Sequence, residues 1–345
     1  MAVPVLEQPA DWAEPGAHLV AAGVHRIPLA LPIPSLHAVN VYVIEDQSGP
    51  IVIDSGWAMP DTRTALEKAL GTLGHRLEDV SQFLVTHAHW DHYSQALALR
   101  EAFGTRVRIG RGERPSIEAF DRALGLHPRQ VGLLRRCGAD GVADRIATMD
   151  IQASERNVPH ALPDSWLDDG ERVVLGRRGL DVFATPGHTR GHVVLRDAFA
   201  GLLFAGDHVL PHISPSIGLE TEPEAKPLRS YLASLRLVRD MPDTLLLPAH
   251  GPVTPSVHTR IDELIEHHAA RLDVAAERVR AGNGTAFEVA RGMPWTRRQR
   301  KLDELDPFSQ MLAVLEIDAH LDVLTDQGIL DAHETGGVRT YAPAR

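Results

Sequence analysis

Apolar and polar residues alternate along residues 24–55, where β-branched side chains are frequent. An alternation with a period of two predicts strands that bury one face. The segment Ser48-Gly49-Pro50 is typical of a turn between two such strands. A helix is expected to follow, with Asp61 as its N-terminal cap and Gly74 after its end. The apolar run at residues 80–85 predicts a buried strand that leads into a histidine-rich segment.

The middle of the chain alternates between helical and strand patterns. Residues 94–103 predict a helix, and residues 106–109 predict a strand. Residues 112–160 are charged, carry several glycines and show no strand pattern, so we expect a helical insertion that could cover a site. Strands return from residue 172 onward, with one helix between them; the segments are 173–175, 180–184, 192–195, 202–205, the helix 227–239 and the strand 244–247.

The pattern becomes helical from about residue 257 and ends in a short hairpin around Gly336-Gly337. The expected helices are residues 261–281, 285–291 and 310–327. Helices followed by a hairpin look like a winged-helix appendage. A chain of 345 residues suits one large domain with a smaller appendage. We therefore predict a catalytic domain at residues 1–256, with the insertion at about 112–160, and a winged-helix-like domain at 257–345.

Composition and charge narrow the classes of function. The net charge of −11 argues against nucleic acid as the main ligand, because phosphate binding depends on clustered Lys and Arg. No apolar run reaches the roughly 18 residues of a membrane helix, and the N-terminus lacks the basic start of a secretory signal. Cys137 is the single cysteine, so an internal disulfide is excluded. We expect a cytoplasmic protein that acts on a small molecule and does not contact a membrane.

The strongest chemical signal is the segment Thr86-His87-Ala88-His89-Trp90-Asp91-His92, which follows the predicted buried strand. Residues two apart on an extended chain point the same way, so His87 and His89 share a direction. A tight turn then returns Asp91 and His92 to the same place. Imidazole nitrogens and a carboxylate are the ligands that zinc prefers. This spacing, after a strand and before a helix, predicts a metal site rather than an accidental run of histidines.

Three further polar clusters follow predicted strands. They contain His188, Asp207 and His250, and each of these residues lies next to a glycine. Glycine lets the backbone turn sharply at such points. Rigid scaffolds present ligands at strand-to-loop junctions of this kind. The four clusters together predict one metal cage built from seven side chains.

These residues resemble the metallo-β-lactamase-fold hydrolase superfamily over about residues 20–260, in particular its glyoxalase II-like and winged-helix-tailed members. The superfamily's motifs are matched in order, by Asp54 in Ile53-Asp54-Ser55-Gly56 and then by the four clusters. The resemblance implies an α/β (α+β) fold, a four-layer αββα sandwich with a helical, winged-helix-like appendage. It implies that Asp54 organises ligands without binding metal. It also implies the following ligand set: His87, His89 and His188 for a first ion, Asp91, His92 and His250 for a second, and Asp207 for both.

Some residues differ from those that members of the superfamily usually carry at the same motif positions, and these differences disfavour particular branches of the superfamily. Ser94 stands where many relatives have Gly, and Arg190 where Pro is frequent, but neither position is a ligand. Asp207 stands where antibiotic-hydrolysing lactamases place a cysteine, and His89 where di-iron oxidoreductases of this fold tend to have Glu. Val209 stands where quorum-signal lactonases often carry Tyr. These three branches are therefore disfavoured.

The cage predicts a hydrolase that holds two divalent ions, with zinc expected and iron or manganese as alternatives. Two cations about 3.5–4 Å apart lower the pKa of a shared water toward neutrality, so a metal-bridging hydroxide can attack without a protein nucleophile. Asp91 is a candidate catalytic residue, because it holds the second ion and can manage the proton. We expect a small ester, thioester or lactone as substrate. The alternatives are a metal-dependent endoribonuclease and, less favoured, a mononuclear iron dioxygenase.

Three more side chains near the ligands each have two interpretations. His208 follows Asp207 and is a candidate catalytic residue that supports the ligands or donates to substrate, or else a polar loop residue. Arg190 is a candidate contact for an anionic substrate group, or else a solvated arginine. Tyr93 is a candidate substrate-binding residue, or else a core aromatic.

The appendage has the wrong charge for a DNA-binding wing. From Asp262 onward it carries 15 Asp and Glu against 10 Lys and Arg, a net charge of −5. We therefore expect a lid or a dimer element, which makes a homodimer one expected assembly. The basic run at residues 297–301 is either a grip on an anionic substrate or RNA, or an exposed helix start.

Overall fold

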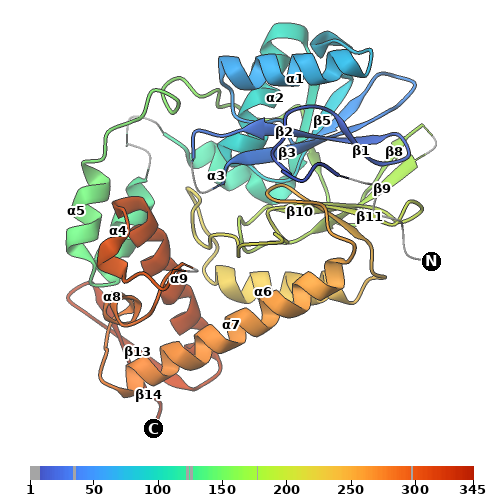
Figure 1. The fold of residues 1–345 in the computed structure, drawn as a ribbon. Helices are drawn as coiled ribbons and strands as arrows, with labels where there is room; N and C mark the ends of the chain where they lie inside the picture. The colour runs from blue at the N-terminus through green and yellow to red at the C-terminus, as the bar shows by residue number, and fades with distance from the viewer. Residues whose placement is uncertain (1–7, 34–35, 122–123, 125–126, 177, 297) are drawn as a thin grey trace.

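Two β-sheets lie face to face, and helices cover both outer faces (Figure 1). The computed structural model describes residues 8–33, 36–121, 124, 127–176, 178–296 and 298–345. Residues 1–7 of the N-terminal segment and Arg297 of the basic run therefore lie outside the described residues. The four-layer αββα order implied by the resemblance is confirmed.

The first sheet contains, in sequence order, the described strands β1 (His18–Ala21), β2 (Val24–Ala30), β3 (Ala38–Ile44), β4 (Ile51–Ile53), β5 (Gln82–Val85), β6 (Arg106–Gly110) and β7 (Ser165–Leu167). Pairing is antiparallel from β1 to β4 and parallel from β4 to β7. β3 is buried along its whole length. Its polar Asn40 and Tyr42 therefore need partners, and both donate a hydrogen bond to Pro248 O at the end of the second sheet.

The second sheet has the order β12 (Leu245–Pro248), β11 (Leu202–Gly206), β10 (Val193–Asp197), β9 (Arg178–Ala184) and β8 (Arg172–Leu175). β11 and β12 are parallel, and the other neighbours are antiparallel. The inner faces of the two sheets meet in a buried apolar cluster that includes Ile53, Leu84, Leu195, Phe204 and Leu247. This layer between the sheets supports the strand ends from which the candidate ligands project.

Helices α1 (Pro60–Thr72) and α2 (Trp90–Phe103) cover the first sheet, and α6 (Pro227–Arg239) and α7 (Val257–Arg280) cover the second (Figure 1). The first pair buries side chains such as Leu66 and Leu97, and the second pair buries Leu235 and Ile261. Burial of apolar surface, worth roughly 25 cal/mol per Å², holds these layers together. Within the described ranges, no helix is long and apolar enough to span a bilayer.

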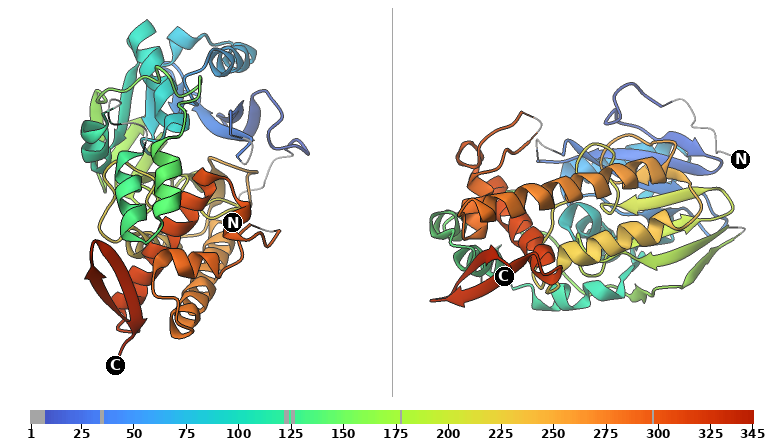
Figure 2. Two further views of the ribbon diagram at one scale, coloured as in Figure 1. Left: turned by 90° about the vertical axis from the view of Figure 1, so that its left-hand side faces the viewer. Right: turned by 90° about the horizontal axis from the view of Figure 1, so that it is seen from below.

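Part of the insertion and the part of the C-terminal segment after α7 form one helical lobe beside the sandwich (Figures 1 and 2). α3 (Arg114–Ala119) stays near the sandwich, and the lobe contains α4 (Pro128–Arg136), α5 (Asp140–Ala147), α8 (Ala286–Arg291), α9 (Pro307–Asp326) and the hairpin of β13 (Leu330–Thr335) and β14 (Val338–Pro343). α4 and α5 pack against α9. Leu134, Ile146, Val314 and Leu330 belong to one apolar cluster that also includes side chains of α6 and α7. A domain boundary at residue 256 and the likeness to a winged helix stay predictions.

Several predicted details were wrong. α1 begins at Pro60 after Met59, so Asp61 lies in its first turn and does not cap it. α2 begins at Trp90 rather than at Ser94, so the turn expected near Asp91 is the first turn of a helix. The helix start expected at residues 297–301 falls at the end of that run: residues 298–300 lie in an exposed loop, and Lys301 is the N-cap of a short 3-10 helix, Leu302–Glu304. Strands β1 and β7 were missed, because each is a short edge strand whose extended form depends on pairing with one neighbour, β1 with β2 and β7 with β6.

Candidate metal centre

Seven polar side chains converge at one edge of the sandwich. They are His87, His89, Asp91, His92, His188, Asp207 and His250. The connection after β5 carries the first two, the first turn of α2 carries the next two, and the loops after β9, β11 and β12 carry one each. Apart from His89, each of these residues is at most 8% exposed. The structure therefore brings together all the ligands that the sequence proposed.

The first group has the spacing of a four-coordinate metal site. The atoms His87 Nε2, His89 Nδ1 and His188 Nε2 lie 3.0, 3.0 and 3.3 Å from one another. Asp207 Oδ2 lies 3.4 Å from His188 Nε2. Ligand atoms around a tetrahedral zinc ion, with bonds of about 2.0–2.2 Å, are separated by about 3.3 Å. The four donor atoms therefore surround a space of the right size for one ion.

The second group shares Asp207 with the first. His250 Nε2 lies 3.4 Å and His92 Nε2 lies 3.5 Å from Asp91 Oδ2. The same two nitrogens lie 3.4 and 3.6 Å from Asp207 Oδ1. Asp207 thus turns one carboxylate oxygen toward each group, as a bridge between two ions requires.

Three atoms at the contact between the groups have no hydrogen-bond partner. His92 Nε2, His250 Nε2 and Asp207 Oδ1 are buried, and none of them makes a hydrogen bond within the described chain. A buried polar atom left without a partner costs about 1–3 kcal/mol, so three such atoms facing one another need a common explanation. A divalent cation would accept a lone pair from each. Five imidazoles and two carboxylates in this arrangement fit two divalent ions.

Backbone carbonyls orient three of the imidazoles. The contacts are His89 Nε2 to Leu219 O at 2.7 Å, His188 Nδ1 to Ser216 O at 2.7 Å, and His250 Nδ1 to Ala38 O at 2.8 Å. A carbonyl oxygen only accepts, so the nitrogen facing it carries the hydrogen. The opposite nitrogen then keeps its lone pair and faces the group. These contacts fix the tautomers that can bind metal.

Asp54 orients the other two imidazoles. Its Oδ2 accepts from His92 Nδ1 at 2.9 Å. Its Oδ1 accepts from the backbone N–H of Thr86 at 2.8 Å and from the Thr86 hydroxyl at 3.0 Å. Thr86 Oγ1 in turn lies 3.0 Å from His87 Nδ1. Asp54 therefore acts on one imidazole of each group, directly on His92 and through Thr86 on His87.

The two groups differ in electrostatics. Burial lowers the pKa of all three imidazoles in the first group, that of His188 to about 3, so these rings are neutral with a free lone pair. Burial by itself would lower the pKa of His92 too. The negative charges of three neighbouring carboxylates have the larger effect, and the pKa of His92 is raised to about 10. The carboxylates of Asp207 and Asp91 likewise raise the pKa of His250, although burial acts to lower it. An ion entering the second group therefore replaces protons.

The remaining candidates lie around the centre. His208 is fully buried, and its ring packs against Tyr231. Tyr93 is 3% exposed, and its hydroxyl donates to a backbone carbonyl. The half-buried Arg190 donates from Nη1 to another backbone carbonyl. A catalytic role for His208, and substrate contacts for Tyr93 and Arg190, stay predictions.

Two buried acids beside the first group were missed. Glu113 is fully buried and accepts a hydrogen bond from the Thr189 hydroxyl. The Glu220 carboxylate accepts from the backbone N–H of Arg190 at 2.9 Å. Burial raises the pKa of Glu113 to about 7, and burial together with the nearby Glu113 raises that of Glu220 to about 8. Glu113 follows a strand, so the junction argument could have found it, but Glu220 lies in an irregular segment without a pattern.

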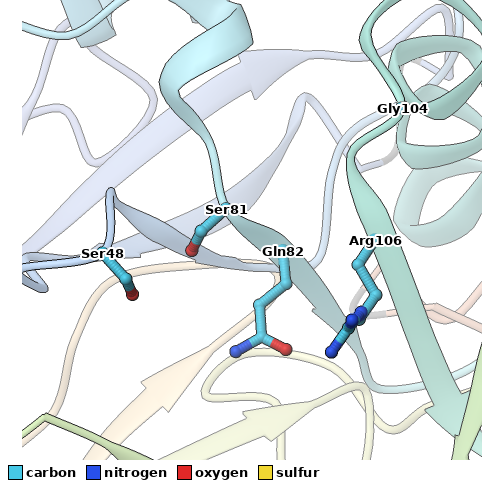
Figure 3. Close-up of a pocket in the computed structure, with 5 residues that line it drawn as sticks. All are labelled: Ser48, Ser81, Gln82, Gly104 and Arg106. Carbon is cyan, nitrogen blue, oxygen red and sulfur yellow. The ribbon is translucent and has the colours of Figure 1, made fainter.

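A polar hollow of 340 Å³ lies away from the metal centre (Figure 3). Ser48, Ser81, Gln82, Gly104 and Arg106 line it. Gln82 and Arg106 are the first residues of β5 and β6, whereas the metal ligands follow the last residue of β5. The hollow is therefore at the opposite end of the strand and contributes nothing to the two groups.

Comparison with known proteins agrees with this geometry. The Metallo-beta-lactamase superfamily profile matches residues 35–250. The chain is 24% identical over 318 residues to the probable metallo-hydrolase YqjP of Bacillus subtilis, which covers 89% of this chain and 95% of that protein. It is 29% identical over 182 residues to a hydroxyacylglutathione hydrolase of Cereibacter sphaeroides, which covers 52% of each chain.

Two solved structures are similar over nearly the whole chain. A metallo-beta-lactamase family protein from Thermus thermophilus has a TM-score of 0.75 at 27% identity and covers 93% of this chain and 99% of its own. A beta-lactamase domain protein from Burkholderia ambifaria has a TM-score of 0.74 at 30% identity and covers 95% of both chains. The family match includes all seven side chains of the two groups. The chain belongs to the metallo-beta-lactamase superfamily and is a metal-dependent hydrolase.

Proposed function

We propose that this chain is a dinuclear hydrolase. In this proposal the first ion is held by His87, His89 and His188, the second by Asp91, His92 and His250, and Asp207 binds both. The observation that carries it is the division of the Asp207 carboxylate between two groups of donor atoms. The dioxygenase alternative needs only one metal ion. It would leave unexplained why a second group of donor atoms exists and why two of its buried imidazole nitrogens have no hydrogen-bond partner.

When bound, the two ions supply a water of lowered pKa and positive charge beside the developing oxyanion. The chain positions the two ions, because hydrogen bonds to the outer nitrogens orient all five imidazole rings. The side chains of Asp91 and Asp207 are 11% and 9% exposed, while that of His92 is fully buried. The carboxylates therefore lie on the accessible side of the centre. We assign Asp91 the transfer of the proton, because its carboxylate borders the second group and is reached from solvent.

The substrate class that we propose is a small ester, thioester or lactone. Hydrolysis of these compounds needs only attack on a carbonyl carbon and a site for the oxyanion. One relative is named as a hydrolase of hydroxyacylglutathione. Cys137 is 2% exposed and follows the last residue of α4, outside both groups, so a thiol nucleophile has no place in this scheme. The net charge of −11 supports a small molecule over RNA.

Zinc is the metal that we propose for both positions. Imidazole and carboxylate ligands at tetrahedral spacing suit zinc, and the same donors also accept iron or manganese. Elemental analysis of protein purified without added metal separates these three. Two equivalents of zinc per chain would support the assignment, and one equivalent of iron would favour the dioxygenase alternative.

The direct test compares metal-free and zinc-loaded full-length protein on four probes. These are an aryl acetate, a hydroxyacyl thioester, a γ-lactone and a single-stranded RNA. We expect hydrolysis of at least one of the first three to require zinc. Absence of zinc uptake, or cleavage of the RNA alone, would contradict the proposal.

A ligand variant checks that the activity comes from this centre. His89→Ala removes one donor of the first group and a half-buried side chain, so we expect a folded protein that loses zinc and hydrolysis together. Circular dichroism, zinc content and turnover measure the three properties. The matched control is His333→Ala, which changes an exposed histidine on the C-terminal hairpin. Full turnover by His89→Ala would reject the ligand set.

A further inference from the structure

One irregular segment, residues 216–220, orients two of the three imidazoles of the first group. Its Ser216 O faces His188 Nδ1, and its Leu219 O faces His89 Nε2, both at 2.7 Å. The second group takes its contacts from the first sheet instead, through Asp54 after β4 and Ala38 in β3. The first group therefore depends on a segment without the support of a strand ladder.

Side chains hold this segment in place. Residues 216–220 belong to no helix or strand, and among the described residues no backbone–backbone hydrogen bond anchors them. The amide of Gln130 in α4 donates from Nε2 to Glu220 O at 2.7 Å and to Gly218 O at 3.3 Å. These two carbonyls flank Leu219. Gln130 is 2% exposed, so its hydrogen bonds are shielded from competition with water.

A second anchor acts on the same segment. The Glu220 carboxylate accepts from the Ser116 hydroxyl at 3.0 Å and from the N–H of Arg190 at 2.9 Å. Arg190 lies two residues after the ligand His188. The segment is therefore fixed from α3, from α4 and from the His188 loop at once.

The position of α4 connects this segment to the rest of the chain. α4 packs against α5, α9 and β14, and its Leu134 is buried in the same apolar cluster as Val314 of α9 (Figure 1). Contacts thus run from the C-terminal helices through α4 and Gln130 to residues 216–220, and from there to the imidazoles. Ile217 of the same segment lies in this apolar cluster as well, so the lobe contacts residues 216–220 through apolar packing and through the Gln130 amide.

We propose that Gln130 is a positioning residue for the first metal group, and that the helical lobe holds residues 216–220 at the distance from which they orient His89 and His188. This inference rests on the dinuclear centre proposed above and gives the C-terminal segment a role inside the enzyme. Loss of the amide leaves two buried carbonyls without donors and lets Leu219 move. The imidazoles then lose the hydrogen bonds that select their metal-binding tautomer.

The second group has a matched counterpart in Asn40. This buried amide of β3 donates from Nδ2 to Pro248 O at 2.9 Å and to Gly251 O at 2.8 Å, the carbonyls on either side of Ala249 and His250. Asn40 thus holds the loop of a second-group ligand as Gln130 holds the segment behind first-group ligands. The pair supplies two buried amides that each donate to two loop carbonyls; Asn40 differs in that its Oδ1 also accepts from Arg26 Nη1 at 2.9 Å.

The test measures zinc affinity in two backgrounds of the full-length chain, by competition with a chromophoric chelator. His250→Ala leaves the first group complete, and His188→Ala leaves the second complete. We expect Gln130→Met to weaken zinc binding by about 10- to 100-fold in the His250→Ala background and by less than about twofold in the other. Asn40→Leu should show the reverse pattern.

The outcomes separate this inference from the proposed function. Equal affinities with and without Gln130→Met in the His250→Ala background would overturn it, as would equal weakening in both backgrounds. A parent protein that binds no zinc would instead overturn the dinuclear centre itself. If Gln130→Met does not fold, Ser116→Ala removes only the hydroxyl that holds Glu220, and it should weaken the first group alone.

Discussion

At the scale of single residues, the Asp54 carboxylate orients imidazoles of both candidate metal groups, His92 directly and His87 through Thr86. The backbone of Asp54 has φ of 58°, a left-handed conformation that Asp and Asn tolerate better than most residues. That conformation turns one oxygen to His92 and the other to Thr86. Both oxygens act as acceptors, so only an ionised carboxylate satisfies both donors.

Asp54→Asn therefore keeps the backbone and removes one acceptor. The amide nitrogen must face either the N–H of Thr86 or that of His92, which leaves two donors opposed. We expect zinc affinity to fall by about 10- to 100-fold with little change in fold. Chelator competition and circular dichroism measure the two effects. Asp331→Asn, at an exposed position of β13, is the control; equal zinc affinity in both variants would refute the assigned role.

At the scale of elements, close contact of backbones positions the His188 loop. A Cβ atom added at Gly191 would lie 1.9 Å from Glu113 N and 2.3 Å from Gly112 C. The segment after β6 and the loop before β10 therefore touch without room for a side chain. This contact places Glu113 beside Thr189, next to a metal ligand.

Gly191→Ala should accordingly destabilise the protein by about 3 kcal/mol, because backbone atoms and not a flexible side chain must move. Urea unfolding of the metal-free protein measures the change. The control is Gly132→Ala in α4, where an added Cβ meets nothing within 4 Å. That variant should gain about 0.5–1 kcal/mol from the better helix propensity of alanine. A stable, zinc-binding Gly191→Ala would show that the loop has more space than the structure allows.

The buried Glu113 predicts a dependence of stability on pH. Burial raises its pKa from the ordinary 4.5 to about 7, so the folded state retains a proton that the unfolded chain releases earlier. The stability from this difference is complete below pH 4.5 and is lost as the pH rises through 7. Glu113→Gln cannot ionise and lacks this loss. Between pH 5 and 8 the wild type should lose on the order of 2 kcal/mol relative to the variant.

Urea unfolding of the metal-free wild type and Glu113→Gln at several pH values tests this expectation. Both proteins contain the same candidate metal ligands, so the titration of those ligands drops out when the two free energies of unfolding are subtracted at each pH. Curves that run parallel from pH 5 to 8 would mean that Glu113 is already ionised in the folded state.

At the scale of the whole molecule, the sandwich and the helical lobe share one apolar core. Leu235 of α6, Leu134 of α4 and Val314 of α9 belong to the same buried cluster. The segment after residue 256 therefore packs against apolar side chains of the preceding chain, in addition to its covalent connection. This arrangement explains why the lobe can act on the metal centre.

A chain that ends at residue 256 should consequently expose the apolar faces of α4, α5 and α6. We expect it to aggregate, or to bind a hydrophobic dye and unfold without a cooperative transition. Size-exclusion chromatography and thermal unfolding, with the full chain as control, measure this. A soluble, cooperative product that binds zinc as the full chain does would show that the two parts fold independently.

Much of the fold followed from local pattern. β5, β6, β11 and α6 were predicted close to their observed bounds, because buried strands and amphipathic helices carry their periodicity in adjacent residues. The start of α2 was placed too late because its first turn is occupied by metal ligands and aromatic residues instead of apolar and capping ones. β7 was missed because only its pairing with β6 makes it a strand.

The sequence by itself determined which side chains are the candidate metal ligands that the fold brings together. Metal binding restricts residue type, and the candidate ligands lie in the loops after β5, β9, β11 and β12 or in the first turn of α2, so their identity and local spacing are visible in the chain. Only the tertiary structure decided how those ligands are held. Gln130, Glu220 and Asn40 act on backbone carbonyls and amides, which every residue possesses, and their partners lie far away in sequence. Such contacts impose no residue type on the partner, so no pattern along the chain could reveal them.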